Sequence, residues 1–246
     1  MPPATKRYWP LARAPRYSLL FALPLLLLYE LLAFVLSGDA IAGVRNGADV
    51  LLKSIFIGLG GRRGLAIFGV ILLGTALILV YRDWKRSGRE LTPGVFLGMM
   101  AESVLYAMLF GFVAASLTSL LLHGTLYTVA AQTAMERMTL PTQLMISLGA
   151  GLYEELLFRV LLVAALAKGG LLLGWKPVTA GIFATVVGAL IFSAFHYIGP
   201  YGDPLEVSSF TFRAIAGVLF SGLYLLRGFG IAAWTHALYD VFLSLR

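Results

Sequence analysis

Long apolar segments recur along this chain, and they restrict its fold to helices packed in a lipid bilayer. We place these segments at residues 17–36, 65–81, 93–122, 141–167, 177–198, 208–226 and 229–245. A helix needs about 20 mostly apolar residues to cross the hydrocarbon core of a bilayer, where its backbone polar groups must be satisfied within the helix itself. The sequence therefore predicts an all-α, polytopic transmembrane bundle of about seven spans with short interfacial helices.

The composition agrees with a lipid environment. Of the 246 residues, 59% are hydrophobic and 13% are charged, whereas soluble domains carry about 25% charged residues. The net charge of +7 would suggest a nucleic-acid partner in a soluble protein. Here the basic residues flank apolar segments, so we expect the lipid bilayer as their partner and no nucleic acid. The chain has no cysteine, which excludes disulfides, thiolate metal sites and a cysteine nucleophile.

The expected organisation is a single integral membrane domain with two parts. Residues 1–139 would hold a basic leader, three spans and interfacial segments, and residues 140–246 would form a four-helix core. The segment 48–59 is too short to span, and Asp49 and Lys53 on one side predict a helix lying in the membrane interface. A second short amphipathic helix is expected around residues 130–138.

The basic residues also predict the orientation. Eleven Lys and Arg residues outside the spans lie on the side of the N-terminus, and six lie on the other side. Because positively charged loops stay in the cytoplasm, we expect a cytoplasmic N-terminus. The end of the fifth span that carries His196 would then face away from the cytoplasm.

Three charged residues stand inside the fourth apolar segment, namely Glu154, Glu155 and Arg159. A charge at the bilayer centre costs about 2.5 kcal/mol or more, so such residues need a partner, a wet cavity or a function. On a helix, Glu155 and Arg159 share one face, and Glu154 points about 100° away. One carboxylate can therefore be neutralised locally while the other faces a different group, for which His196 and His236 are the candidates.

Two of the three histidines lie in or at the end of late spans, and each has a partner four residues away. Asp240 is placed to accept a hydrogen bond from one ring nitrogen of His236, which would leave the other nitrogen free. Two imidazoles and a carboxylate suffice for hydrolysis in two ways. Glu154, His196 and His236 can hold a divalent ion such as Zn²⁺ with an open position for water. Alternatively, Glu154 takes a proton from water while the histidines stabilise the oxyanion.

Three motifs occur in this order on separate late spans: Glu154-Glu155-x-x-x-Arg159, Phe192-x-x-x-His196 and His236-x-x-x-Asp240. Together they resemble the CPBP family of CAAX-processing and bacteriocin-processing intramembrane endopeptidases, also called the Abi family, to which the Ras-converting CAAX protease is related. The resemblance covers about residues 140–245.

The resemblance implies a role for each motif residue. Glu154 would activate water, His196 and His236 would line the site, and Asp240 would orient or supplement them. The remaining two, Glu155 and Arg159, would form a structural pair. The family is described as metal-dependent, and a metal-free glutamate mechanism has also been proposed for it, so both remain open.

The implied substrate is a membrane-associated protein or peptide, cleaved at a CAAX-like or sorting tail or at a leader, in a prokaryotic cytoplasmic membrane. Two other readings stay open. The same acids and histidines can relay protons in a proton-coupled transporter, or the chain can be a catalytically silent scaffold of the family. Glu30 and Glu102 also lie within spans. We expect them to be structural, either lining a polar cavity or pairing with Arg213.

Overall fold

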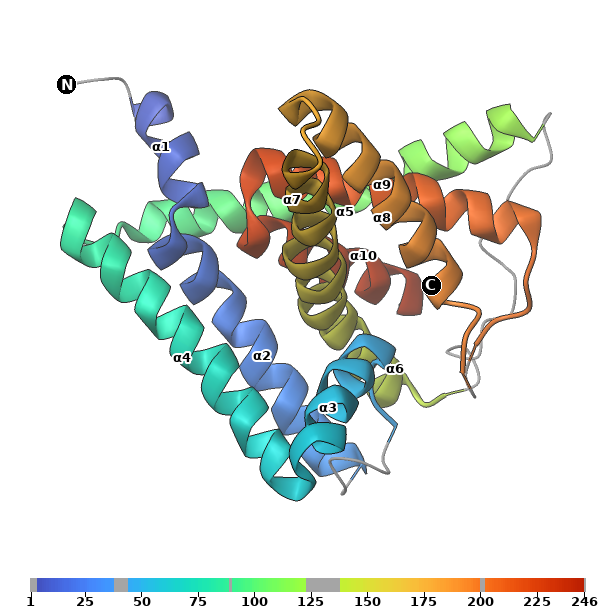
Figure 1. Ribbon diagram of the computed structural model, residues 1–246, viewed down its shortest axis with the longest axis horizontal. Helices are drawn as coiled ribbons and strands as arrows, with labels where there is room; N and C mark the ends of the chain where they lie inside the picture. The colour runs from blue at the N-terminus through green and yellow to red at the C-terminus, as the bar shows by residue number, and fades with distance from the viewer. Residues whose placement is uncertain (1–3, 38–43, 89, 123–137, 200–201, 246) are drawn as a thin grey trace.

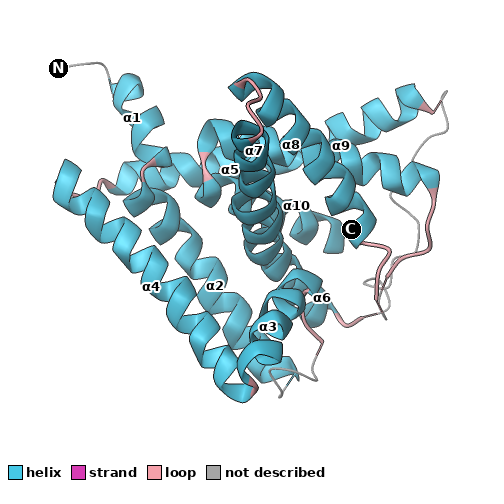
Figure 2. Cartoon of the chain, viewed as in Figure 1, coloured by secondary structure: helices cyan, strands magenta, loops and turns pink. Residues whose placement is uncertain are grey.

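The computed structural model describes residues 4–37, 44–88, 90–122, 138–199 and 202–245 (Figure 1). Within these ranges every regular element is a helix and no strand occurs, which confirms the all-α prediction (Figure 2). The expected helix around residues 130–138 falls, except for its last residue, outside the described residues. The elements are α1 (Ala4–Arg13), α2 (Pro15–Ser37), α3 (Gly47–Gly60), α4 (Arg62–Ser87), α5 (Pro93–Leu121), α6 (Leu140–Gly149), η2 (Ala150–Val163), α7 (Ala164–Leu172), α8 (Pro177–Phe195), α9 (Val207–Arg227) and α10 (Phe229–Ser244).

Proline and glycine set several of the helix ends. Pro93 and Pro177 stand in the first turn of α5 and α8, where the missing N–H would have had no helical partner. Gly228 separates α9 from α10 at a φ of 84°, a left-handed conformation that glycine adopts at little cost. This single residue lets two long helices follow each other with a sharp change of direction.

Five helices of the described chain, α2, α4, α5, α8 and α9, are long and apolar enough to cross a membrane. The chain is therefore an integral membrane protein. The expected fourth span corresponds to α6, η2 and α7, which follow one another without a break, and the expected seventh to the 16-residue α10. Neither adds to the five, so the count of about seven stays a prediction.

Helix α10 is the centre of the bundle and packs against α2, α5, α6, η2 and α9. Its contact with η2 is very close at Gly151, where a Cβ atom would lie 2.3 Å from the carbonyl oxygen of Ala233. Only glycine fits at such an approach. Because α10 and η2 both carry motif residues, this contact brings two of the three motifs together.

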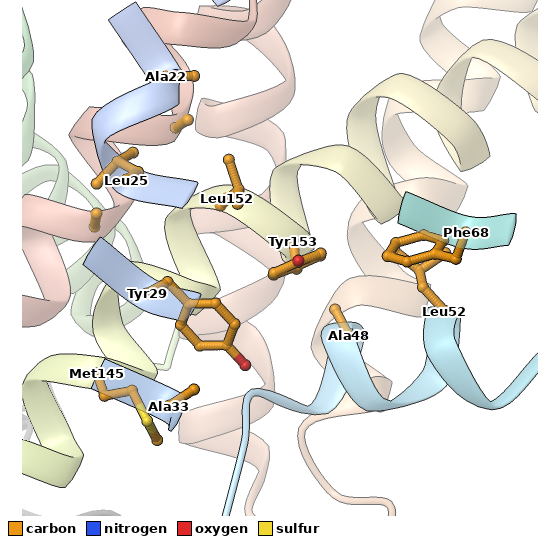
Figure 3. Close-up of a cluster of buried hydrophobic side chains, with 12 residues drawn as sticks. Ala22, Leu25, Tyr29, Ala33, Ala48, Leu52, Phe68, Met145, Leu152 and Tyr153 are labelled. Atoms are coloured by element: carbon orange, nitrogen blue, oxygen red, sulfur yellow. The ribbon is translucent and has the colours of Figure 1, made fainter. Parts of the chain in front are cut away.

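A buried apolar cluster joins the N-terminal helices to η2 (Figure 3). Tyr29 of α2 and Tyr153 of η2 pack edge to face with ring centroids 5.3 Å apart. Leu52 of α3 and Phe68 of α4 belong to the same cluster. The helix that carries the glutamates is therefore packed against α2, α3 and α4 as well as against its own half of the chain.

Helix α3 is short, as predicted, but its charged side faces the protein. Asp49 is fully buried, and the Lys53 side chain is 12% exposed, whereas Leu59 is 82% exposed. An interfacial helix would present its charges to headgroups and water. The charges that suggested the interface instead find partners on α2 and within α3. The position of α3 in the membrane interface stays a prediction.

Candidate active site

The glutamates lie on η2, a π-helix in which each backbone N–H bonds the carbonyl five residues back. The sequence predicted an ordinary α-helix here. The expected pair still forms, with Oε1 of Glu155 3.3 Å from Nη1 of Arg159, and both side chains are buried. Such π segments are rare and occur frequently at functional sites.

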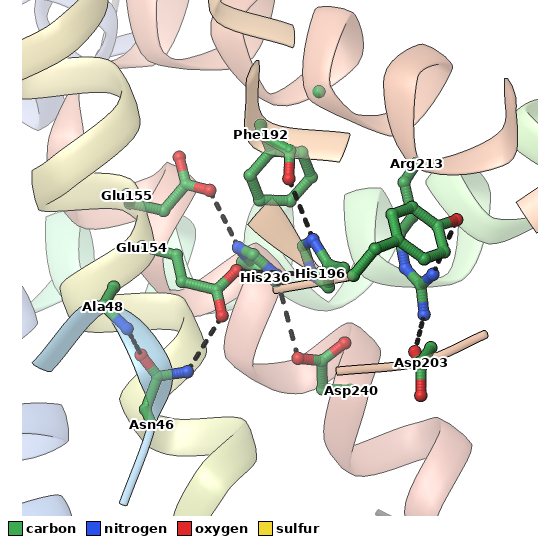
Figure 4. Close-up of polar contacts among 12 residues, drawn as sticks. Asn46, Ala48, Glu154, Glu155, Phe192, His196, Asp203, Arg213, His236 and Asp240 are labelled. Carbon is green, nitrogen blue, oxygen red and sulfur yellow. Dashed lines mark hydrogen bonds and ion pairs between the residues drawn. The ribbon is translucent and has the colours of Figure 1, made fainter. Parts of the chain in front are cut away.

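Glu154 meets both late imidazoles (Figure 4). Its Oε2 atom lies 3.9 Å from Nε2 of His196 and 3.9 Å from Nε2 of His236. Its Oε1 atom accepts a hydrogen bond of 2.8 Å from Nδ2 of Asn46. Although Oε2 is buried, it has no hydrogen-bond partner among the described residues. Residues far apart in the sequence thus converge on one carboxylate.

The tautomers of the two histidines follow from their other ring nitrogens. Nδ1 of His196 lies 2.9 Å from the Phe192 carbonyl oxygen, and Nδ1 of His236 lies 2.8 Å from Oε1 of Glu155. Both partners only accept hydrogen bonds, so each Nδ1 carries the proton. In the neutral state each Nε2 then presents a lone pair toward Glu154. Three groups with lone pairs around one space suit either a water molecule, which can donate hydrogen bonds to them, or a cation, which can bind their lone pairs.

The partner that holds His236 differs from the one expected. Oδ2 of Asp240 lies 3.7 Å from Nε2 of His236, which is too long for a hydrogen bond. Glu155 takes that place because the close contact of η2 with α10 brings its carboxylate to Nδ1. Glu155 therefore contacts both Arg159 and His236, rather than Arg159 alone.

Aromatic rings surround these groups. Phe192 meets the His196 ring edge to face at 4.9 Å, as their four-residue spacing indicated, and lies 4.3 Å from the Arg159 guanidinium. The ring of Phe220 stacks on His236 at 4.5 Å. These contacts limit how far the two imidazoles can rotate.

The candidate site is partly exposed, and only on one side. The His196 and Asp240 side chains are 24% and 18% exposed, whereas Glu155 is fully buried. Access to Glu154 is therefore from the side of His196 and Asp240. An apolar groove of about 280 Å³ between α8 and α9 contains none of the motif side chains, so it is separate from this site.

The other intramembrane acids have partners of their own. Glu102 forms an ion pair of 2.8 Å with Arg227. Arg213 instead bonds Asp203, so the expected pairing of Glu30 or Glu102 with Arg213 was wrong. The backbone N–H of Asp203 donates a hydrogen bond to the His196 carbonyl oxygen. This bond holds the loop after α8 so that Asp203 reaches Arg213. Glu30 is paired with basic residues near α3.

Asn46 is the site residue that sequence reasoning missed. It stands directly before α3 and caps that helix, and asparagine before an apolar helix is a recognisable capping signal. Nothing in the local pattern indicates its contact with a residue 108 positions away. Phe220 was missed for the same reason, because its contact with His236 depends on how α9 and α10 pack.

The donor set suits a divalent metal chemically, with two imidazole nitrogens and a carboxylate. With Zn–N distances of about 2.0–2.1 Å, neighbouring ligands of tetrahedral zinc lie about 3.3 Å apart. The separations of 3.9 Å from Glu154 to each histidine are longer. Over the described ranges, no group of three or more His, Cys, Asp or Glu side chains has the geometry of a metal site. As placed, these residues do not close on an ion.

Comparison with known proteins finds a family model that matches the region of this site. Residues 136–242 match the family model of type II CAAX prenyl endopeptidases, Rce1-like, and this range includes all three motifs. Comparison with curated proteins and with solved structures finds no match. The family is one of proteases, which supports an enzyme that acts on a peptide or protein substrate in a membrane. The region 136–242 thus matches the Rce1-like type II CAAX prenyl endopeptidase domain, a domain of the CPBP/CAAX protease family.

Proposed function

We propose that this protein is an intramembrane endopeptidase in which Glu154 activates the attacking water. One observation supports this most strongly. The Oε2 atom of Glu154 is buried with no hydrogen-bond partner in the described chain, and the Nε2 atoms of His196 and His236 both lie 3.9 Å from it. A water molecule in that space can donate one hydrogen to Glu154 and the other to His196.

In the proposed reaction, the water oxygen bonds to the peptide carbonyl carbon as its proton passes to Oε2 of Glu154. The protonated Nε2 of His236 donates a hydrogen bond to the resulting oxyanion. Three carboxylates within 3.9 Å stabilise the positive charge on His236: Glu155, Asp240 and Glu154. The C–N bond then breaks as Glu154 returns its proton to the leaving amine, giving a new carboxyl end and a new amino end. General-base catalysis contributes about 10²–10⁴-fold to such reactions.

A bound metal is the second form of this proposal. Zn²⁺ held by Glu154, His196 and His236 would polarise the carbonyl and make the bound water more acidic. The three donors would have to move closer together than they lie here. Metal analysis of the purified protein, followed by activity assays with and without a chelator, distinguishes the two forms.

The proposed substrate is the C-terminal tail of a membrane-anchored protein. The Rce1-like match favours a prenylated CAAX tail, which would require a site open to the cytoplasm. The proposed cytoplasmic N-terminus would instead turn the His196 end outward, where a sorting tail would be the substrate. A reporter fused after Arg246 decides between them. A cytoplasmic signal favours the CAAX tail, and a signal on the opposite side favours the sorting tail.

The test of the activity is cleavage by the full chain in liposomes. The probe is a quenched fluorescent peptide that ends in a farnesylated CAAX sequence, with a hydrophobic sorting-tail peptide in parallel. We expect Glu154→Gln to lower kcat by about 10²–10⁴-fold. Glu102→Gln is the matched control, since Glu102 is also an acid within a span but is paired with Arg227. Full activity of Glu154→Gln would contradict the proposal.

A further inference from the structure

The catalytic carboxylate is held from outside the family-matched region. Asn46 precedes α3, and its Nδ2 atom donates a 2.8 Å hydrogen bond to Oε1 of Glu154. Both residues are buried, at 3% and 6% exposure. We propose that Asn46 is a positioning residue that sets the orientation of the Glu154 carboxylate for the reaction. This inference rests on the proposed role of Glu154.

The orientation of the Asn46 amide is determined by its second contact. Its Oδ1 atom accepts a hydrogen bond of 2.9 Å from the backbone N–H of Ala48, at the start of α3. A flipped amide would place its NH₂ group against that N–H and its oxygen against the Glu154 carboxylate, and both contacts would be repulsive. The cap on α3 therefore directs the donor nitrogen toward Glu154.

Two neighbours hold Asn46 in place. The Tyr29 hydroxyl accepts a hydrogen bond from the Asn46 backbone N–H at 3.2 Å and donates one to Asp49 at 2.7 Å. On the other side, a Cβ atom at Gly149 would lie 2.9 Å from Cβ of Asn46. Because Gly149 has no side chain, α6 can approach Asn46 closely at the point where η2 begins.

As a consequence, the two carboxylate oxygens of Glu154 have different roles. Asn46 occupies Oε1, so the oxygen without a partner among the described residues, Oε2, faces His196 and His236. Without the Asn46 donor, the carboxylate can turn and leave the position from which it takes the proton. This loss affects the chemical step rather than substrate binding, so it should lower kcat and leave KM unchanged.

The experiment separates this role from helix capping. Asn46→Ser and Asn46→Asp both retain a good N-cap, but neither can donate to Glu154 as asparagine does. In the liposome assay with the farnesylated CAAX peptide or the sorting-tail peptide, we expect both to lower kcat by about 10–100-fold. The midpoint of thermal unfolding of Asn46→Ser should stay within about 3 °C of that of the unchanged protein.

A residue that only caps α3 would behave differently, since Ser and Asp would then retain full kcat. Full kcat in both variants, with Glu154→Gln inactive, overturns the role of Asn46 and leaves the proposed function standing. An active Glu154→Gln overturns the proposed function itself.

Tyr29→Phe provides a second measurement if the Asn46 variants do not fold. It removes the hydroxyl that accepts the Asn46 N–H but leaves Asn46 in the chain. We expect kcat to fall by about 2- to 10-fold with KM unchanged. An unchanged kcat in a folded Tyr29→Phe protein counts against the positioning role.

Discussion

Two groups of carboxylates lie within the described bundle, and they differ in how their charges are balanced. In the first, which we call the α2–α3 cluster, Glu30 and Asp49 face Arg45 and Lys53. Each acid contacts each base at 2.7–3.2 Å. Burial is the largest single influence and disfavours the charge on Arg45. The hydrogen bond to Asp49 and the charge interactions with Asp49, Tyr29 and Glu30 together outweigh it, so the pKa of Arg45 lies above its usual value. Two negative charges thus meet two positive ones.

In the second group, at the candidate active site, acceptors outnumber donors. The carboxylates of Glu154, Glu155 and Asp240 surround two imidazoles. Arg159 forms an ion pair with only one of these three carboxylates, that of Glu155. An unsatisfied buried acceptor costs about 1–3 kcal/mol, so this arrangement is not explained by stability. Within this membrane protein we therefore expect function where acidic groups outnumber basic ones, and a structural role where the two are equal in number.

Among the substitutions that test this difference between the two groups, we expect the largest loss of kcat at His236. We predict that His236→Gln lowers kcat by about 10²–10³-fold, because it removes the proposed donor to the oxyanion. The unfolding midpoint should change little by comparison. The measurement is peptide cleavage in liposomes together with thermal unfolding. A variant that cleaves at the normal rate would show that His236 is not part of the chemistry.

The opposite pattern is expected in the α2–α3 cluster. Lys53→Met removes one positive charge and leaves Glu30 and Asp49 to share Arg45. We predict a loss of about 2–3 kcal/mol in the free energy of unfolding, with kcat of the folded protein close to normal. Unfolding titrations of the purified protein test the first part. A Lys53→Met protein with lowered kcat and unchanged stability would contradict the structural role of the α2–α3 cluster.

An intermediate effect is expected at Glu155, whose carboxylate contacts both Arg159 and His236. Glu155→Gln keeps an oxygen that can accept from Nδ1 of His236 but removes the charge that stabilises its protonated ring. We predict a fall in kcat of about 10–100-fold, as is typical of partners behind a catalytic group. Unchanged kcat with lowered stability would return Glu155 to a purely structural pair with Arg159.

The smallest effect is expected at Asp240. Its carboxylate lies 3.7 Å from Nε2 of His236, too far for a hydrogen bond, and its side chain is 18% exposed. We predict that Asp240→Asn retains kcat within about tenfold of the normal value, since no direct bond is lost. A loss as large as that of His236→Gln would show that Asp240 moves into contact when substrate binds.

The apolar segments were enough to predict the helical class, and the periodicity of one helix was enough to predict contacts along it. Glu155 with Arg159 and Phe192 with His196 are four residues apart, and both contacts are present. Residues so spaced lie on one helix face whatever surrounds them. The same rule did not succeed for Asp240, because a residue on a different helix binds His236 more closely.

By itself, the sequence determined that the chain folds into apolar helices and that the motif residues share faces on three of them. Only the tertiary structure decided that α3 turns its charges inward, that Glu155 binds His236 and that Asn46 reaches Glu154. The physical reason is that spacing sets neighbours along one helix. Which side chains meet across helices depends on how closely the helices approach, as at Gly149 and Gly151.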